Sequence, residues 1–267
     1  AWPEGPVVAR VNGVEIKTAD WRAEVTRQLR LATEQYQIDW NDRANIDRLP
    51  AFLDRELEHM VDLELLRQAA AREGITITEA DVEKEAAVIG AHVVAGGQYK
   101  DLDAYLQANQ LTPEGFRAQV YERILRERLL AVHGGTAEVE QVHARHILVD
   151  DEATAQEVLR KLAVGESFEA LARAYSKDSG SRERGGDLGW VPPGVLEAGL
   201  DEAVFALGVG ETSRPVRTRF GYHIVRVEER ARRALAEPMA SQRREEQFAA
   251  WLAAQRSASK IEKLYSS

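Results

Sequence analysis

The chain has 267 residues, and because 44% of them are hydrophobic it can bury the core of one large domain or two modest ones. Its 35 Lys and Arg against 44 Asp and Glu give a formal net charge of −9 without a basic stripe, which argues against nucleic acid and against a polybasic membrane-surface motif. The absence of cysteine excludes disulfides, thiolate nucleophiles and cysteine-based zinc sites, and it suits an oxidising compartment.

The first elements predicted along the chain are a hairpin and a helix. Residues 7–16, "VVARVNGVEI", contain Asn12-Gly13, a turn dipeptide that tolerates positive φ. Thr18 is predicted to cap a helix that runs through Tyr36. Because a lone two-stranded hairpin is marginal in water, residues near 260–264 are expected to pair with or pack against residues 7–16.

Further helices are predicted next, so that residues 17–133 form a helical domain. Thr78 begins a capping-box pattern with Asp81, and Thr112-Pro113 combines a cap with a first-turn proline. From about residue 47 to residue 72, apolar side chains recur at three- and four-residue spacing: Leu57, Met60, Val61, Leu65 and Ala69.

The helical pattern stops at Gly134-Gly135, and strands, short helices and glycine turns follow as far as Glu229. After Arg230 the pattern predicts a helix again, with one apolar stripe of Phe248, Trp251 and Leu252. We therefore divide the chain into three parts: residues 1–137, 138–230 and 231–267.

Two histidines stand inward on predicted strands of the middle part. In "VHARHILV", residues 142–149, the period of two places His146 on one face with Ala144 and Leu148. In "TRFGYHIVRV", residues 218–227, His223 shares a face with Val225 and Val227. Two neutral imidazoles can satisfy each other and a nearby hydroxyl without any charge, so a buried pair is chemically reasonable.

Residues 141–230 resemble a parvulin-type peptidyl-prolyl isomerase domain. The matching pieces occur in order: "ARHILV", "FEALARAYSKDSGS", "GGDLGWV", "AVFALGVGETSRPV" and "FGYHIVRV". A chance match of so many ordered pieces is negligible. The resemblance implies an α+β domain with a four-stranded, mostly antiparallel sheet and surrounding helices. It also implies two histidines close together beneath the active cleft, and neither a metal nor a cofactor.

The resemblance also implies the site residues. The polar set is His146, Asp178, His223 and Thr218, and the apolar pocket for the proline ring is Leu188, Leu196, Leu200 and Phe220. Asp178 occupies a position where family members carry either Cys or Asp. Many members carry phenylalanine in place of Leu200, so this pocket is expected to lack a flat aromatic wall and the isomerase to be weaker.

Several other interpretations of these residues stay open. The histidines form either a hydrogen-bond network or a general acid–base pair, and we favour the network because rotation of an amide needs no net proton transfer. A zinc site of His143, His146, Asp187 and His223 is disfavoured because His143 lies on the opposite strand face from His146. A serine hydrolase based on Ser176 or Ser179 lacks a nucleophile elbow. Asp178 could also be a loop cap, and Leu188 and Leu200 ordinary core residues.

The loop after the first strand of this domain is acidic. Phosphate-directed parvulins carry a basic cluster there, whereas this chain has Asp150, Asp151 and Glu152. Three consecutive acids repel a phosphate, so specificity for phosphorylated Ser/Thr-Pro is not expected.

The flanking parts resemble the chaperone body of the PrsA/SurA-type extracytoplasmic foldases, in "VVARVNGVEIKTADW", "ELEHMVDLELLRQAAAREGITITEADV" and "LDAYLQANQLTPEGFRAQVYERILRERLL". This resemblance implies a helical body into which the isomerase domain is inserted, with the C-terminal helix returning to the N-terminal domain. The alternative is a plain helical bundle or a dimerisation arm without a client groove.

The function implied is a peptidyl-prolyl isomerase and chaperone that helps exported proteins fold, acting on unfolded chains with X-Pro bonds. The alternative is a holdase whose parvulin domain is weakly active or inactive. No apolar run approaches the length of a membrane span. Because the chain begins with alanine, we expect a processed or trimmed start, at which a signal peptide or an anchor could have been lost. The resemblance to extracytoplasmic foldases implies a location in the cell envelope, periplasmic, membrane-anchored or secreted.

Overall fold

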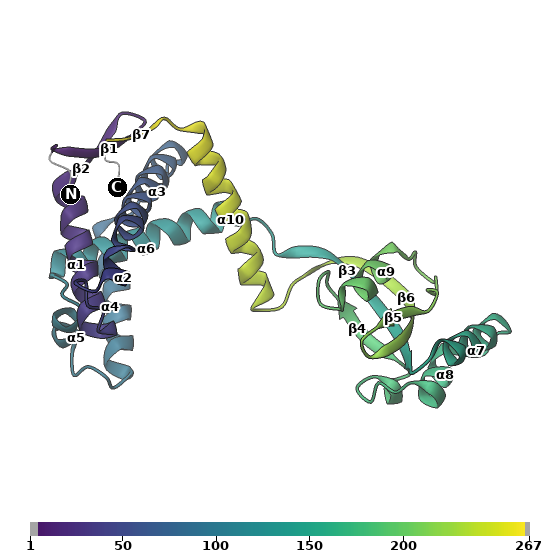
Figure 1. Cartoon of the computed structure of the whole chain (residues 1–267). Helices are drawn as coiled ribbons and strands as arrows, with labels where there is room; N and C mark the ends of the chain where they lie inside the picture. The colour runs from purple at the N-terminus through teal and green to yellow at the C-terminus, as the bar shows by residue number, and fades with distance from the viewer. Residues whose placement is uncertain (1–4, 265–267) are drawn as a thin grey trace. The chain divides into compact units, whose positions relative to one another are not determined.

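The structure is a computed structural model that describes residues 5–264 and divides into two compact units (Figure 1). One unit combines the chain up to Gly135 with the segment from Arg243 onward, and the other is Thr136–Gln242. Helices dominate the first unit and an antiparallel sheet with helices forms the second, so the predicted α+β class is confirmed.

The elements of the first unit are, in chain order, β1 (Val7–Val11), β2 (Val14–Lys17), α1 (Thr18–Tyr36), α2 (Arg43–Ile46), α3 (Leu49–Glu73), α4 (Glu79–Ala95), α5 (Leu102–Ala108), α6 (Pro113–His133), α10 (Met239–Ala258), whose first residues still belong to the second unit, and β7 (Ile261–Lys263). One core cluster lies beneath the small sheet and joins Trp21 of α1 to Leu57 and Val61 of α3. Another packs Phe248 of α10 against Leu125 of α6, together with further residues of α3.

Two of the three predicted helix caps are confirmed. The Thr78 side chain accepts a hydrogen bond from the Asp81 N–H, and the Asp81 carboxylate accepts one from the Thr78 N–H in return. Thr112 accepts from the Gly115 N–H at 3.0 Å, and Pro113 is the first helical residue. The cap predicted at Thr18 is wrong. Because β2 runs directly into α1, Lys17 occupies the cap position and Thr18 is already helical.

The small sheet joins the two ends of the described chain, as predicted. Its strand order is β2-β1-β7, and both pairings are antiparallel. Val11 pairs with Ile261, and the Asn12 N–H donates to the Lys260 carbonyl at 2.8 Å. Asn12 and Gly13 both have positive φ, which confirms the predicted turn. Figure 1 shows β7 beside β1.

The elements of the second unit are β3 (Glu138–Val149), α7 (Glu152–Ala163), α8 (Phe168–Tyr175), the short 3₁₀ helix η1 (Arg182–Arg184), β4 (Asp187–Val191), α9 (Ala198–Ala206), β5 (Val216–Thr218) and β6 (Gly221–Ala234). The sheet order is β4-β3-β6-β5, and every neighbouring pair is antiparallel. The helix predicted after Arg230 begins only at Met239, because β6 continues to Ala234 in its ladder with the start of β3.

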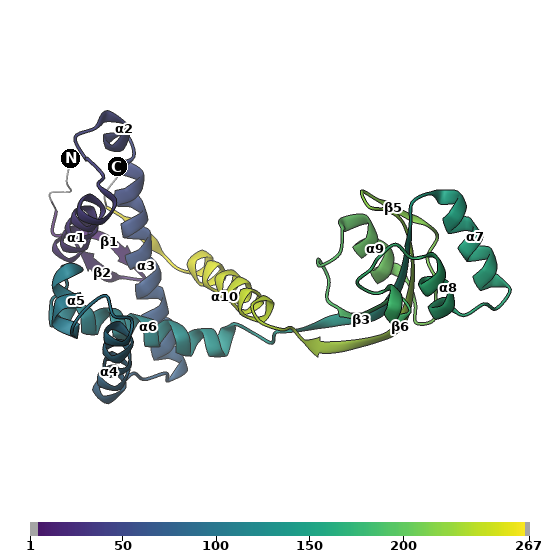
Figure 2. The same ribbon diagram turned by 90° about the horizontal axis from the view of Figure 1, so that it is seen from below.

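Helices cover both faces of this sheet (Figure 2). On one face Ile147 and Ile224 pack against Phe168 of α8. On the other face Ala144 and Val225 pack against α9. Each strand therefore contributes alternate side chains to two separate cores, in agreement with the period of two.

Truncation after Ala258 is expected to destabilise the first unit. The change removes the ladder between β1 and β7 and the contact of Ile261 with the core, which together contribute about 2–4 kcal/mol. The melting temperature of the helical unit should fall by roughly 5–10 °C, measured by circular dichroism. Lys263→Gln is the control, because it keeps the strand but removes the ion pairs with Asp54 and Glu58. An unchanged melting temperature after truncation would mean that β7 contributes nothing.

Candidate functional site

The ladder between β3 and β6 brings the two predicted histidines together. Val225 stands opposite His146, and His223 stands opposite Leu148, so both imidazoles lie on the sheet face that carries Ala144 and Val225. His146 is 7% exposed and His223 is 4% exposed. Their ring centroids are 5.4 Å apart, and the Nδ1 atoms are 3.2 Å apart, within hydrogen-bond distance.

Asp178 reaches the histidines from the loop that follows α8. The Ser176 hydroxyl holds this loop, because it accepts from the Leu148 N–H at 3.2 Å and from the Asp178 N–H at 3.3 Å. On the other side the Gly186 carbonyl accepts from the His146 N–H at 2.8 Å. A Cβ on Gly186 would lie only 2.3 Å from the His146 carbonyl oxygen, and its φ is +80°, so this close approach requires glycine.

A continuous series of hydrogen bonds crosses the site. His146 Nε2 lies 2.8 Å from Asp178 Oδ2 and 3.1 Å from Ser181 Oγ. At the other end His223 Nε2 lies 2.8 Å from Thr218 Oγ1, which also accepts from the Phe220 N–H at 3.1 Å. The structure thus brings together all four residues of the predicted polar set.

Donor and acceptor matching assigns the protons when both imidazoles are neutral. An ionised Asp178 only accepts, so His146 Nε2 carries a proton and His146 Nδ1 is an acceptor. His223 Nδ1 must then donate to His146, which leaves His223 Nε2 to accept from the Thr218 hydroxyl. Each ring nitrogen then has one role, either donor or acceptor, and the network needs no charge on either ring.

The pKa values agree with this assignment. Partial burial opposes ionisation of Asp178, but hydrogen bonds from Ser181 and His146 outweigh it and lower the pKa to about 2. Burial, reinforced by the neighbouring His146, lowers the pKa of His223 to about 4. Near neutral pH the site therefore contains a carboxylate and a neutral His223.

Ser181 belongs to the network but was missed in the sequence. It is almost fully buried, and its hydroxyl donates to Asp178 Oδ2. Its position three residues after Asp178 in a turn-forming stretch is the signal that could have identified it. His143 lies outside the network: its Nε2 contacts Asp187 Oδ1 at 2.9 Å and its ring stacks on Trp190.

The four predicted apolar residues differ in exposure. Leu200 is buried in the core cluster beneath α9, and Leu188 and Leu196 pack against that cluster while partly exposed. Phe220 is 58% exposed, and the Arg219 guanidinium lies 4.7 Å from the centroid of its ring. Leu188 and Leu196 therefore keep part of their apolar surface exposed, whereas Leu200 is an interior residue of the same cluster.

These features define a peptidyl-prolyl isomerase domain of the parvulin type, and residues 145–229 match the family model of the PPIC-type PPIase domain. Residues 3–130 match the SurA-like N-terminal domain. The chain belongs to the PrsA/SurA-like foldase family, and it is a peptidyl-prolyl isomerase and chaperone.

The similarity to known proteins extends over most of the chain. It is 33% identical over 244 residues to the foldase protein PrsA of Caldanaerobacter subterraneus subsp. tengcongensis, which covers 84% of this chain and 74% of that protein. PrsA of Geobacillus kaustophilus is 50% identical over 93 residues, 35% of this chain and 33% of the relative. The crystal structure of PrsA from Bacillus cereus is 22% identical and covers 91% of this chain and 84% of that one, with a TM-score of 0.47.

The isomerase unit is expected to lose stability as the pH falls from 6.5 to about 4. In this window the unfolded chain binds a proton on His223 that the folded chain does not bind, so acid favours unfolding. The lowered pKa corresponds to a loss of about 3 kcal/mol over the window. Hydrogen exchange of β3 and β6 amides, corrected for intrinsic rates, reports this unit separately.

His223→Gln is the matched variant for this experiment, because it keeps polar atoms in place but does not titrate. Its unfolding free energy should vary much less between pH 6.5 and 4. An equal slope in both proteins would assign the acid sensitivity to another group. Asp178 adds a loss only below about pH 3.8, since its pKa is lowered from that value.

Proposed function

We propose that Asp178, His146, His223 and Thr218 are the functional polar groups of the isomerase, and that its site isomerises X-Pro bonds of unfolded exported proteins outside the cytoplasm. The observation that carries this proposal is the unbroken hydrogen-bond series from Thr218 to an ionised Asp178.

The reaction requires only that the amide be stabilised in its twisted form. The barrier of about 18–20 kcal/mol reflects the loss of amide resonance as the C–N bond rotates. A site lowers this barrier when it binds the twisted amide better than either planar form. No covalent bond needs to form or break, so the side chains act through position, charge and exclusion of water.

Asp178 acts on the carbonyl oxygen of the rotating amide. Resonance gives this oxygen negative charge in the planar amide, and twisting removes part of it. A nearby carboxylate therefore raises the free energy of the planar form more than that of the twisted form, and this lowers the free-energy barrier to rotation. Asp178 remains ionised for this role because its pKa is about 2.

The histidines position the groups that face the substrate. His146 fixes Asp178 through Nε2, and His223 fixes Thr218 through Nε2. Because the pKa of His223 is about 4, this imidazole is neutral near pH 7 and links Thr218 to His146 through hydrogen bonds rather than acting as an acid. The proline ring is held by the exposed parts of Leu188 and Leu196, with Leu200 beneath them and Phe220 at the edge.

The family and the composition support the proposed clients and the proposed place of action. The relatives are named foldases and chaperones, which supports unfolded proteins as substrates. A cysteine-free chain suits an oxidising compartment outside the cytoplasm. Within residues 5–264, no helix combines the length and apolar character needed to cross a bilayer.

Asp178→Ala is expected to lower kcat/KM for a proline peptide roughly tenfold or more, which corresponds to about 1.4 kcal/mol or more of transition-state stabilisation. A protease-coupled isomerisation assay measures the rate, and thermal melting measures stability. Asp178→Asn is the matched variant, since it keeps the shape and an acceptor oxygen but removes the charge.

Both variants should be slow in the assay while they remain folded, although each should melt at a lower temperature than the parent, because the hydrogen bonds from Ser181 and His146 stabilise the ionised carboxylate. If the Asn variant retains full activity, the charge has no role in catalysis. If the variants lose activity only because they are unfolded at the assay temperature, Asp178 is a structural residue. A parent chain that does not accelerate isomerisation at all would favour the holdase alternative.

Phosphoserine ahead of proline should not increase turnover relative to serine. Asp151 caps α7, and hydrogen bonds from Thr154 lower its pKa, so it is ionised where phosphate-directed parvulins carry a basic cluster. Its charge repels a phosphate. The same assay with paired peptides tests this, and a clear gain with phosphoserine would overturn the argument from the acidic loop.

A further inference from the structure

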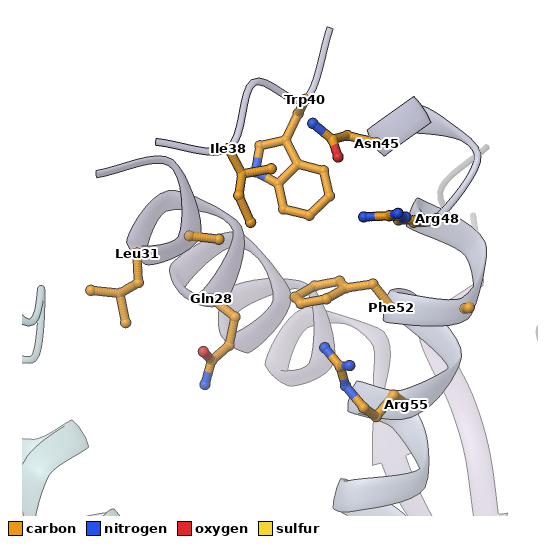
Figure 3. Close-up of a pocket in the computed structure, with 10 residues that line it drawn as sticks. Gln28, Leu31, Ile38, Trp40, Asn45, Arg48, Phe52 and Arg55 are labelled. Carbon is orange, nitrogen blue, oxygen red and sulfur yellow. The ribbon is translucent and has the colours of Figure 1, made fainter. Parts of the chain in front are cut away.

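The helical unit contains a cavity that is distinct from the hydrogen-bonded site of the isomerase unit. A cavity of about 570 Å³ lies where the second half of α1, the loop 37–42, α2 and the first turns of α3 meet (Figure 3). We call it the Trp40 pocket. Its lining residues are Gln28, Leu31, Ala32, Ile38, Trp40, Asn45, Arg48, Ala51, Phe52 and Arg55. Its volume lies within the range of about 300–1,000 Å³ that is usual for ligand pockets.

Two aromatic rings form the wall of the Trp40 pocket. The ring centroids of Trp40 and Phe52 are 5.8 Å apart with an angle of 53° between the rings. Ile38 lies beside Trp40, and Phe52 points toward them from α3 (Figure 3). Trp40, Phe52 and Ile38 are partly exposed, so an incoming aromatic or large aliphatic side chain can bury additional apolar surface here.

The wall is held in place before any ligand binds. The indole N–H of Trp40 donates to the Leu29 carbonyl at 3.1 Å. Asn45 Nδ2 donates to the Asp39 carbonyl at 2.9 Å, and the Asp39 side chain accepts from the Asn41 N–H at 2.8 Å. A loop fixed in this way loses little conformational entropy when a ligand binds, which favours affinity.

The charged side chains that line the Trp40 pocket are both arginines, Arg48 and Arg55. The lining contains no acid, although the chain carries a net charge of −9. The Arg55 guanidinium lies 5.1 Å from the Phe52 ring centroid; its side chain is 70% exposed and contacts Glu56 at 3.7 Å. Within residues 5–264 no carboxylate forms an ion pair with Arg48, whose side chain points toward the space beside Trp40 and Phe52 (Figure 3).

We propose that the Trp40 pocket binds unfolded client segments in which an aromatic or large aliphatic residue is followed or preceded closely by Asp or Glu. The apolar side chain lies against Trp40 and Phe52, and the carboxylate pairs with Arg48 and Arg55. In an extended peptide successive side chains point to opposite faces, and residues two positions apart lie on one face about 7 Å from each other. The Arg55 guanidinium lies 5.1 Å from the Phe52 ring centroid, so we place the acid two positions from the apolar residue. This proposal rests on the chaperone part of the proposed function, and it adds a sequence preference.

Proline-free peptides of glycine and serine test the preference in the full chain. Each is acetylated and amidated, and contains one pair of residues separated by a single glycine. The pairs are Phe and Asp, Phe and Asn, Phe and Lys, or Ala and Asp, and each peptide is named by its pair. Binding is followed by NMR through the indole N–H resonance of Trp40, assigned with Trp40→Phe. The Phe-Asp peptide should shift this resonance and leave those of Trp21, Trp190 and Trp251 unchanged. The Phe-Asn peptide should bind about fivefold more weakly, and the Phe-Lys and Ala-Asp peptides more weakly still.

Arg48→Gln should remove most of the difference between the Phe-Asp and Phe-Asn peptides while the protein stays folded. Arg43→Gln is the matched control, because Arg43 is an exposed residue of α2 outside the pocket lining. Equal binding of the Phe-Asp and Phe-Asn peptides would overturn the charge preference. A Trp40 resonance that stays unchanged at saturating peptide would overturn the site. If the amidated Phe-Asp peptide does not bind, but a Phe peptide with a free C-terminal carboxylate does bind, the assignment to acidic side chains is overturned.

A separate measurement distinguishes failure of this proposal from failure of the chaperone function. Suppression of aggregation of a reduced, unfolded protein reports chaperone activity without reference to the Trp40 pocket. Activity that is equal in the parent chain and in Trp40→Ala would show that the chain holds clients elsewhere, and would overturn the pocket as a client site. A loss of activity in Trp40→Ala and in Arg48→Gln, but not in Arg43→Gln, supports it.

Discussion

The contact between His146 Nδ1 and His223 Nδ1, at 3.2 Å, is the constraint on which the isomerase unit depends. Two buried imidazoles can lie this close only if one donates and the other accepts, so at least one ring must be neutral. The low pKa of His223 satisfies this condition. The contact also needs β3 and β6 in one register, because a slip by one residue would turn one histidine to the opposite face of the sheet.

The register is secured by features on both sides of the histidines. β3 pairs with β6 along its whole length, from Glu138 opposite Ala234 to Val149 opposite Tyr222, with one irregularity between His143 and Ala144. Two hydrophobic cores, one on each face, fix the alternation of side chains. The polar network then adds Asp178 and Thr218 at its ends. A buried polar network in which every member has a partner makes one strand register much more stable than the alternative registers.

Much of this arrangement could be predicted from sequence because it depends on periodicity. Alternation placed His146 and His223 inward, and the capping pattern placed the start of the helix after Thr78. Features that depend on where loops return in space were missed. Ser181 enters the network only because the loop after α8 folds back under His146. The Trp40 pocket needs a loop, a four-residue helix and two longer helices to meet. Thr18 failed as a cap because a strand leads directly into its helix, and neighbouring structure overrode a local preference.

Two units with different chemistry suit the two tasks of a foldase. Holding an unfolded chain requires affinity for its ground state, whereas equal binding of the planar and twisted amides does not raise kcat. A site that bound the ground state of a client tightly would be saturated at a lower client concentration, but it would not accelerate rotation of the amide bond. The isomerase unit accordingly offers a carboxylate and a small apolar surface, whereas the helical unit offers an aromatic wall and arginines. Separation into two sites allows ground-state affinity to increase in one without slowing release of the isomerised bond from the other.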